Sequence, residues 1–365
     1  MERNRHELQD LVARYSYQPD DLLKGMIILH EPAGQTTVRR DSSSSTFGLL
    51  DQLPVELLYF LLGFLDLRSI SHLSQVSLRG HVVVRSFHIY RDLLKYASRA
   101  LTVLGRTRSI RYHSATTLHT ALFSHDCVSC RHFGTFLFLP TFESCCYECL
   151  SKNQSLWVAS RALVKKCFDL DDHQIKKLPV LRSLPDLYQI GTQPEISRTR
   201  RLNLVSVKSA KALGLKVHGS TANMPDWDSL CRPWAPSTKH LKEYNYLRWL
   251  QAAPMQPLDG DPVILPRQPH TPNDNYCGMA SIPFPSIGRD GQHDSGLWCR
   301  GCEWACENLL HEDEQEIEAP LSYSIPPDCD VEDVLLALAH RARPKIEFAS
   351  HIQNCYGVKK LADDV

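Results

Sequence analysis

The sequence predicts a mainly α-helical protein that carries small metal-bound β elements, and three observations support this fold class. Apolar residues recur at helical spacing in residues 49–78 and again in residues 85–122. Paired cysteines in residues 123–155 have the two-residue spacing of metal ligands. The composition, 43% hydrophobic and 22% charged, allows most of the chain to form a core. The length of 365 residues favours two or three domains.

Residues 1–46 are expected to form a flexible N-terminal tail, with a short helix near Leu11 and a Ser-rich linker over residues 41–46. The first residues lack the apolar core of a signal peptide, and no apolar run reaches the length of a membrane span. We therefore expect a cytoplasmic or nuclear protein that does not contact membranes. In those compartments the 13 cysteines favour metal ligation over disulfides.

Residues 47–82 are predicted to form a small helical hairpin or bundle. Pro54 suits the first turn of a helix, with Asp51 upstream as its cap and Glu56 adding favourable charge. Asp66 and Ser69 supply a turn and a cap before a second helix. The two apolar stripes comprise Leu58, Leu61, Leu62 and Leu65, with Leu57 on the flank, and then Ile70, Leu73 and Val76. A hairpin this small cannot bury all these side chains internally, which indicates a partner helix.

The same residues carry a resemblance to a known module. Leu53-Pro54-x-Glu56-Leu57-Leu58, then Leu65-Asp66 and finally Val76-Ser77, follow the order of an F-box, which this segment resembles. An F-box binds a Skp-family adaptor, which links a substrate receptor to the cullin scaffold of an SCF-type ubiquitin ligase. The resemblance therefore implies a binding subunit for an unknown protein substrate and not an enzyme. It assigns adaptor binding to Leu53, Pro54, Glu56, Leu57, Leu61, Leu65, Ile70 and Leu73.

After a helical connector over residues 83–122, residues 123–155 are predicted to hold a first metal site. Two residues between cysteines let a tight turn direct both thiolates at one ion, and two such pairs make a closed tetrahedral site. The segment between the pairs alternates aromatic and apolar residues and favours a β-hairpin, so the module is predicted to be a structural zinc ribbon. The ligands are Cys127, Cys130, Cys146 and Cys149, and Cys145 is a spare. The alternative is a set of buried free cysteines.

Residues 156–365 are predicted to be a mixed α and irregular C-terminal region that binds the substrate. Helices are expected over residues 156–195, broken by prolines, and near 209–213, ended by Gly214. Residues 252–295 are rich in Pro, Gly, Asp and Asn and are expected to be mostly loop. A helix capped by Asp330 should end before Pro344, and a last helix should span 345–355.

A second, weaker metal constellation lies in this C-terminal region. Cys299 and Cys302 form another two-residue pair, with Gly301 supplying the turn. His351 and Cys355 are four residues apart and so share one helix face. These four residues are predicted to bind a second structural Zn²⁺. Cys306, His311 and Cys329 are alternative fourth ligands, and the competing interpretation is a core histidine with inert cysteines.

Further motifs extend the resemblance over most of the chain. They are Phe133-Gly134-Thr-Phe136, Leu178-Pro-Val-Leu-Arg-Ser-Leu-Pro185, Trp298-Cys-Arg-Gly-Cys302 and His351-x-x-x-Cys355, and together they resemble a group of filamentous-fungal F-box-domain proteins. Phosphate-loop, nucleophile-elbow and zinc-protease motifs are absent.

The charge pattern bears on a rival function. The formal net charge is zero, with 41 basic and 41 acidic residues, which makes nucleic acid an unlikely partner. The alternative function is a zinc-dependent nucleic-acid-binding regulatory protein whose leucine-rich hairpin is only core. A third reading is an F-box protein that acts with the adaptor alone, outside a ligase.

Overall fold

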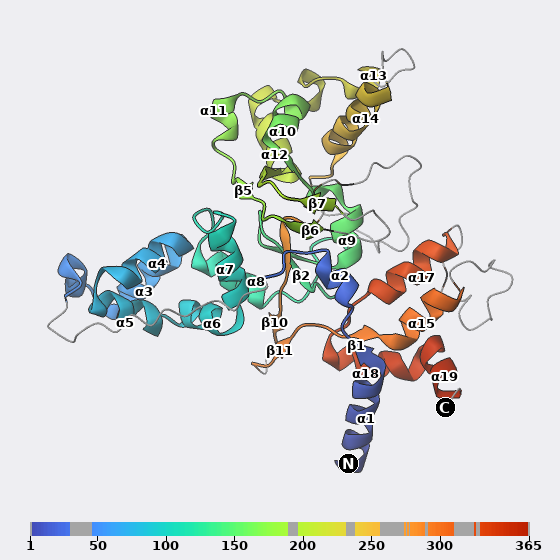
Figure 1. Ribbon diagram of the computed structural model, residues 1–365. Helices are drawn as coiled ribbons and strands as arrows, with labels where there is room; N and C mark the ends of the chain where they lie inside the picture. Colours follow the sequence, from blue (N-terminus) through green and yellow to red (C-terminus); the bar gives the residue numbers. More distant parts are fainter. Residues whose placement is uncertain are drawn as a thin grey trace.

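The computed structural model describes residues 2–29, 46–188, 196–230, 238–255, 274, 276, 278–288, 291–309, 325 and 329–363. The chain is mostly helical with small antiparallel sheets, which confirms the predicted mainly α class. Three helical lobes surround a small central sheet, and both termini lie in the same lobe (Figure 1). In the described part of the chain, no helix has both the length and the apolar character needed to cross a membrane.

The first lobe, which we call the helical arm, comprises residues 46–122. Its elements are η1 (Gly48–Gln52), α3 (Val55–Phe64), α4 (Leu67–Val76), α5 (Leu78–Ser86), α6 (His88–Tyr96), α7 (Ser98–Arg106) and α8 (Ala115–Leu122). Each helix packs on its neighbour in the chain from α4 to α7, and α8 returns to pack on α3 and α6. Their inward apolar residues, such as Leu62, Leu93 and Leu118, join the largest hydrophobic core of the molecule.

The central module comprises residues 123–155 together with strand β9 (Ser281–Pro283). The predicted hairpin is confirmed, because β2 (Phe136–Phe138) pairs antiparallel with β3 (Glu143–Cys145) in the register Phe136↔Cys145. Strand β9 pairs with the other edge of β2, which makes the order β3-β2-β9. Helix α9 (Tyr147–Lys152) and η2 (Gln154–Leu156) follow β3 directly. Strand β9 lies within residues 252–295, where mostly loop was expected.

The upper lobe, residues 157–253, differs from the helical region expected there. Strand β4 (Val158–Ser160) pairs with β8 (Asn203–Ser206), which also pairs with β5 (Leu181–Arg182). The short apolar run at Val158 suits helix and strand equally, and its strand partner lies far away in the chain. The remaining elements are α10 (Arg161–Phe168), α11 (Asp172–Ile175), the β6–β7 hairpin (Asp186–Tyr188, Ile196–Arg198), α12 (Val207–His218), η3 (Thr221–Asn223), α13 (Trp227–Leu230) and α14 (Thr238–Ala252).

Helix α12 does not end at Gly214, as the sequence predicted. It continues to His218 and ends at Gly219, whose φ of 78° is the left-handed conformation that glycine adopts without strain. Gly214 is instead buried, and a Cβ there would lie 3.2 Å from the Cβ of Phe168. Its lack of a side chain therefore allows α12 to pack closely on α10.

The third lobe, which we call the C-terminal module, contains β12 (Trp298–Cys299), α15 (Arg300–Leu309), α17 (Val331–His340), α18 (Lys345–Asn354) and α19 (Tyr356–Asp363). The predicted cap is confirmed, because the Asp330 side chain accepts a hydrogen bond from the Glu332 N–H at 2.9 Å. Helix α18 follows Pro344, as expected. The hairpin of β10 (Ser286–Ile287) and β11 (His293–Asp294) runs between this module and the arm (Figure 1).

The described part of the N-terminal segment is folded, in contrast to the flexible tail that the sequence predicted for residues 1–46. Helix α1 (Glu2–Tyr15) packs on α18, and β1 (Ser16–Tyr17) pairs antiparallel with β12. Helix α2 (Asp20–Lys24) and the residues after it bury Leu22 and Met26 in the main core. Most of the Ser-rich linker, residues 41–45, lies outside the described residues. The tail was mispredicted because its partner strand lies almost 300 residues away.

Candidate metal centres and docking face

The first cysteine cluster forms where the central sheet meets α9. Cys127 and Cys130 lie in the turn before β2, Cys146 is the N-cap of α9, and Cys149 lies in that helix. Their four Sγ atoms lie within 4.8 Å of one another, and the Sγ atoms of Cys130 and Cys146 are 3.6 Å apart. None of the described cysteines is in a disulfide. The four residues predicted from the spacing are thus brought together, and they could hold a metal ion.

Backbone N–H groups prepare this cluster for negative charge. The Ser129 N–H donates to the Cys127 Sγ at 3.5 Å, and the Cys149 N–H donates to the Cys146 Sγ at 3.4 Å. The pKa of Cys127 lies far below its usual range, because the thiols of Cys130, Cys146 and Cys149 donate hydrogen bonds to it. The same bonds raise the pKa values of Cys146 and Cys149. A metal that binds here must therefore displace thiol protons.

Cys145 stands outside the cluster, as the sequence analysis proposed. Its side chain is fully buried, and its Sγ lies 3.6 Å from the backbone oxygen of Phe136. Burial raises the pKa of this thiol well above its usual value. Cys145 is the last residue of β3 whereas Cys146 is the N-cap of α9, and only the Cys146 side chain joins the cluster.

The second cluster joins Cys299 and Cys302, at the junction of β12 and α15, to His351 and Cys355 near the end of α18. The four ligand atoms again lie within 4.8 Å of one another. The Cys302 Sγ is 3.3 Å from the His351 Nε2 and 3.8 Å from the Cys355 Sγ, and the Cys299 Sγ is 3.8 Å from the Cys355 Sγ. The predicted convergence of two pairs almost fifty residues apart is confirmed.

Two details of the second cluster differ from the sequence analysis. Gly301 does not form a turn with unusual backbone angles; it lies in α15, where a Cβ would come 2.3 Å from the Val358 nitrogen. Conversely, a Cβ on Gly357 would come 1.8 Å from the Gly301 oxygen, so the two glycines allow α15 and α19 to touch. Cys355 is the residue that caps α18, one position beyond its last turn.

The two alternative fourth ligands that the structure describes, Cys306 and Cys329, are not in the second cluster. Cys306 and Cys329 belong to a separate apolar group around α15 and α17, whereas His311 lies outside the described residues. The pKa of Cys355 lies far below its usual range, because the thiols of Cys299 and Cys302 donate hydrogen bonds to it. The pKa values of Cys299 and Cys302 are raised, so the second cluster, like the first, contains one thiol with a lowered pKa.

Both clusters have the size of a tetrahedral metal site. With metal–sulfur bonds of ~2.3 Å, tetrahedral geometry places two sulfur atoms ~3.8 Å apart, and sulfur and imidazole nitrogen ~3.6 Å apart. The measured separations between sulfur atoms are 3.6 Å and 3.8 Å, and that between sulfur and nitrogen is 3.3 Å. Because no two ligand atoms of a cluster are more than 4.8 Å apart, shifts of about 1 Å or less would bring each set around one ion.

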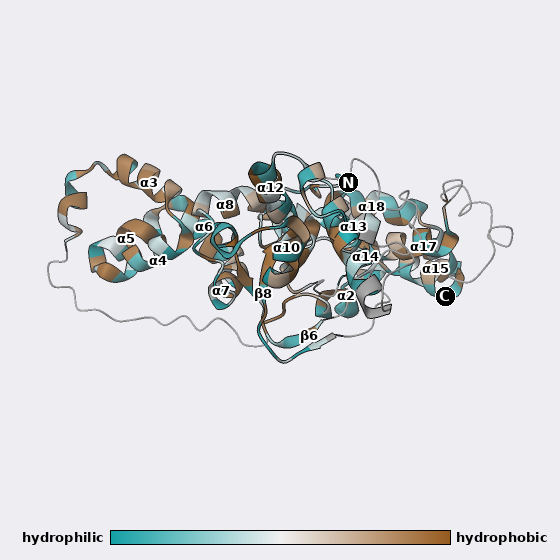
Figure 2. Cartoon of the chain, turned by 90° about the horizontal axis from the view of Figure 1, so that it is seen from above, coloured by the Kyte–Doolittle hydropathy of each residue, from teal (hydrophilic) through white to brown (hydrophobic). Residues whose placement is uncertain are grey.

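The third candidate site is an exposed apolar face on α3, which we call the docking face. It consists of side chains that are 47–71% exposed, and the hydropathy colouring shows brown along this helix at the far end of the arm (Figure 2). The ring of Phe60 packs edge-on against that of Phe64, with centroids 4.8 Å apart, and neither is covered by the rest of the chain. The members of the docking face are Leu57, Phe60, Leu61 and Phe64.

The opposite side of α3 holds the helix in place. Leu58 and Leu62 are buried, and the Thr116 hydroxyl of α8 donates to the Gly63 backbone oxygen at 2.7 Å. Leu61 was expected on this buried stripe but is exposed. Asp66 caps α4 as predicted, because its side chain accepts from the Ser69 N–H at 3.0 Å.

Other predicted roles in this segment need correction. Asp51 does not cap α3, because its carboxylate accepts from the Phe47 N–H at 2.6 Å and pairs with Arg79 at 3.3 Å. Ile70 is completely buried and cannot touch a partner in this structure. Among the other residues assigned to adaptor binding, Pro54, Glu56, Leu57 and Leu61 are exposed, and Leu53, Leu65 and Leu73 are half-buried.

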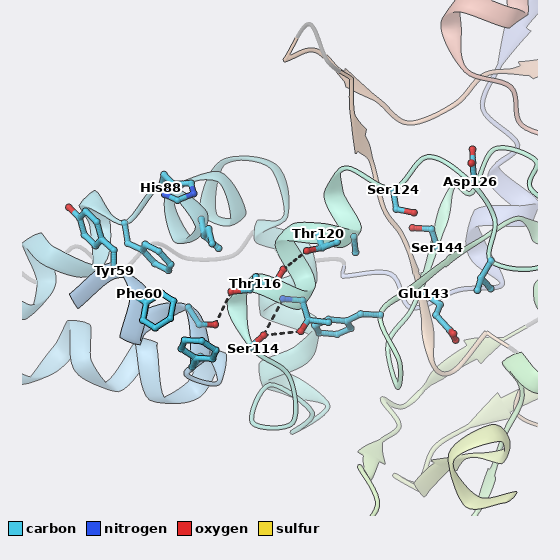
Figure 3. A pocket seen from close by; sticks show the side chains of 18 of the residues that line it. Tyr59, Phe60, His88, Ser114, Thr116, Thr120, Ser124, Asp126, Glu143 and Ser144 are labelled. Carbon is cyan, nitrogen blue, oxygen red and sulfur yellow. Dashed lines mark hydrogen bonds between the residues drawn. The ribbon is translucent and has the colours of Figure 1, made fainter. Parts of the chain in front are cut away.

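The docking face continues into an open groove of about 1320 Å³ between α3, α8 and the first cysteine cluster (Figure 3). Tyr59 and Phe60 form its apolar end, and Thr116 and Thr120 of α8 line the middle. Polar groups such as Glu143 close the end nearest the cluster. The sequence analysis did not identify Phe60 and Phe64, although their spacing with Leu57 and Leu61 is a second helical stripe.

The arm also carries a positive charge that the neutral total conceals. Residues 67–125 contain nine arginine and lysine residues and a single acid, Asp92. All nine are exposed. Among the described residues, no ion pair with an acid is formed by Arg68, Arg85, Arg91, Lys95, Arg99, Arg108 or Arg111. A block of this kind weakens the argument that zero net charge excludes an anionic partner.

Comparison of the chain with known protein families, with curated proteins and with solved structures finds no match.

Proposed function

We propose that this protein is the substrate-binding subunit of an SCF-type ubiquitin ligase and docks a Skp-family adaptor through α3. The observation that supports this proposal most directly is the docking face on a helix that begins with the F-box-like sequence Leu53-Pro54-x-Glu56-Leu57. A monomeric protein rarely leaves so many large apolar side chains together in water. Their burial in an apolar groove of a partner would supply most of the binding energy.

The positive charge of the arm suggests the character of the partner surface. A docking face with an apolar centre and cationic surroundings fits a protein whose groove has an acidic rim, since charge complementarity accelerates association and fixes orientation. Nucleic-acid interfaces are polar and positive throughout, so exposed Phe60 and Phe64 speak against that alternative. The unpaired arginines nevertheless favour the zinc-dependent nucleic-acid-binding regulator enough to make it the rival in the test below.

We further propose that both clusters hold structural Zn²⁺. Thiolate and imidazole ligands favour this ion, and four protein ligands leave no position open for substrate. The bound ion would supply only cross-linking: in the first cluster it would join the turn before β2 to α9, and in the second it would join α15 to α18. Because metal binding and folding are coupled, the two ions would rigidify the surfaces that hold the protein substrate. The chain itself would perform no catalysis.

The test is reconstitution of the full chain with a purified Skp-family adaptor, followed by addition of the cullin scaffold. We expect a stable complex with the adaptor that recruits the cullin, and a weakened complex for a Leu53→Ala, Pro54→Ala double variant that keeps its zinc. An adaptor complex that excludes the cullin would indicate action outside a ligase. Absence of adaptor binding, together with DNA retention that decreases steeply with salt, would overturn the proposal in favour of the rival.

A further inference from the structure

The segment between α17 and α18, residues 340–343, contacts both cysteine clusters. His340 ends α17, and its Nδ1 lies 2.7 Å from the Oε1 of Glu148. Glu148 is buried between Cys146 and Cys149 of the first cluster. The His340 ring also packs edge-on against Tyr147, with centroids 4.8 Å apart. One end of the segment is thus anchored to the second cysteine pair of the first cluster.

The same segment fixes the strand that leads into the second cluster. The His340 backbone oxygen accepts from the Trp298 Nε1–H at 3.1 Å, and Trp298 precedes the ligand Cys299 in β12. Three residues along, Arg343 exchanges two backbone hydrogen bonds with Leu297, each 2.9 Å long. These bonds set the position of β12 and therefore the position of Cys299.

The other end of the segment reaches a ligand sulfur. The Arg343 guanidinium is buried, and its Nη2 donates to the Cys302 Sγ at 3.8 Å. Three thiolates, one imidazole and a divalent ion have a net negative charge, which a neighbouring buried cation stabilises. Arg343 is therefore a positioning residue for the second cluster, and it belongs to the segment that His340 ties to the first.

We propose that residues 340–343 couple the two clusters, so that a metal ion in one raises the affinity of the other. The inference depends on the proposed metal binding. An ion in the first cluster fixes the positions of Cys146 and Cys149, and therefore that of Glu148 between them. Glu148 in turn fixes His340 through their contact. The segment that begins at His340 then orders β12 and places Arg343 beside Cys302. Because coupling between sites is reciprocal, each ion must affect the other by the same factor.

The experiment is a chelator-competition titration of the full chain with zinc. Cys130→Ser disables the first cluster, and we expect it to weaken the second site about tenfold, within the usual range for coupled sites. Cys355→Ser disables the second cluster and must weaken the first site by the same factor. In a His340→Phe background, which keeps the ring against Tyr147 but removes the bond to Glu148, both effects should disappear. The two cysteine variants test the coupling in opposite directions, so the experiment remains decisive if one of them folds poorly.

Lys152→Met is the matched control. Lys152 pairs with the Glu148 Oε2 at 2.9 Å, so this variant removes a different contact of Glu148 and leaves the 340–343 segment intact. It should retain the full coupling factor. Two sites that bind zinc with affinities independent of each other would refute the coupling and leave the metal proposal standing. A wild-type chain that binds no zinc would instead refute the metal proposal.

Discussion

Phe60→Ala is expected to weaken adaptor binding strongly while it leaves the fold intact. Phe60 is 64% exposed, and its side chain lies on the docking face. A phenylalanine that is buried completely removes about 200 Å² from water, so the exposed part represents roughly 130 Å². At ~25 cal/mol per Å², its burial by a partner contributes about 3 kcal/mol, of which the alanine methyl retains a small part. The dissociation constant should therefore rise roughly 30- to 150-fold.

The stability of the free protein should change little in this variant. The main loss is the edge-on contact with Phe64, worth about 1 kcal/mol, and alanine partly compensates through its high helix propensity. The assay is isothermal titration with purified adaptor, combined with thermal unfolding of the free variant. Because Phe60 is exposed in the free protein, its removal should reduce adaptor affinity without a comparable loss of folding stability.

Two control variants make the result interpretable. Ile346 on α18 is 86% exposed, so Ile346→Ala removes a comparable apolar side chain far from the docking face and should leave adaptor affinity unchanged. Leu62 faces the core of the arm, so Leu62→Ala should destabilise the protein by about 2–5 kcal/mol. If Phe60→Ala binds the adaptor as tightly as the wild-type chain does, α3 is not the contact surface and the reasoning is wrong.

Three further perturbations test the clusters and the core. Elemental analysis should give two zinc ions for the wild-type chain and for Cys145→Ser but one for Cys130→Ser; loss of an ion in Cys145→Ser would mean that the ligand set is wrong. Gly357→Ala places a Cβ 1.8 Å from the Gly301 oxygen, so it should separate α15 from α19 and lower the zinc content, and normal zinc content with an unchanged unfolding temperature would contradict the close packing. Burial lowers the pKa of His113 from 6.5 to about 4, so its stabilising effect is complete above pH 6.5 and is lost as the pH falls towards 4. His113→Phe, which preserves stacking on Phe142, should reduce the pH dependence of the unfolding temperature in that window, and an identical pH profile would refute the assignment.

Features that depend on local chemistry could be predicted from the sequence. The cap at Asp330, the cap at Asp66 and the β2–β3 hairpin each involve residues only a few positions apart. The cysteine pairs belong to the same class, because their spacing alone directs two sulfur atoms at one point. The joining of Cys299 and Cys302 to His351 and Cys355 was predictable only because unmatched pairs of metal ligands need partners.

Features that depend on distant partners could not be predicted. Strand β1 was assigned to a flexible tail because Cys299, which pairs with Ser16, is far away in the chain. Strand β4 was assigned to a helix for the same reason, since Val158 pairs with Ser206. Nothing in these short segments identifies the strand that completes their hydrogen bonding.

The orientation of α3 illustrates a different limit. Its sequence, VELLYFLLGF, is apolar almost all round, and periodicity cannot decide which of two apolar stripes faces the core. One stripe contains Leu58 and Leu62, and the other contains Leu57, Phe60, Leu61 and Phe64. A helix that is apolar on every side needs a neighbour on every side, whereas α8 is the helix that packs on α3 in the described part of the chain. The excess of apolar side chains on α3 is the sequence signal for a binding partner, and the exposed Phe60 and Phe64 belong to this excess.

The long separation between Cys302 and His351 has a physical role in the proposed arrangement. A compact metal-binding finger needs only a short loop between its ligand pairs, whereas almost fifty residues separate Cys302 from His351. The described part of that insertion contains α17, which ends at His340 beside the first cluster before the chain returns to the second. The extra length is therefore what allows one chain segment to touch both clusters. If the coupling is measured, a shortened insertion that bypasses α17 should keep both ligand sets and abolish the effect of one ion on the other.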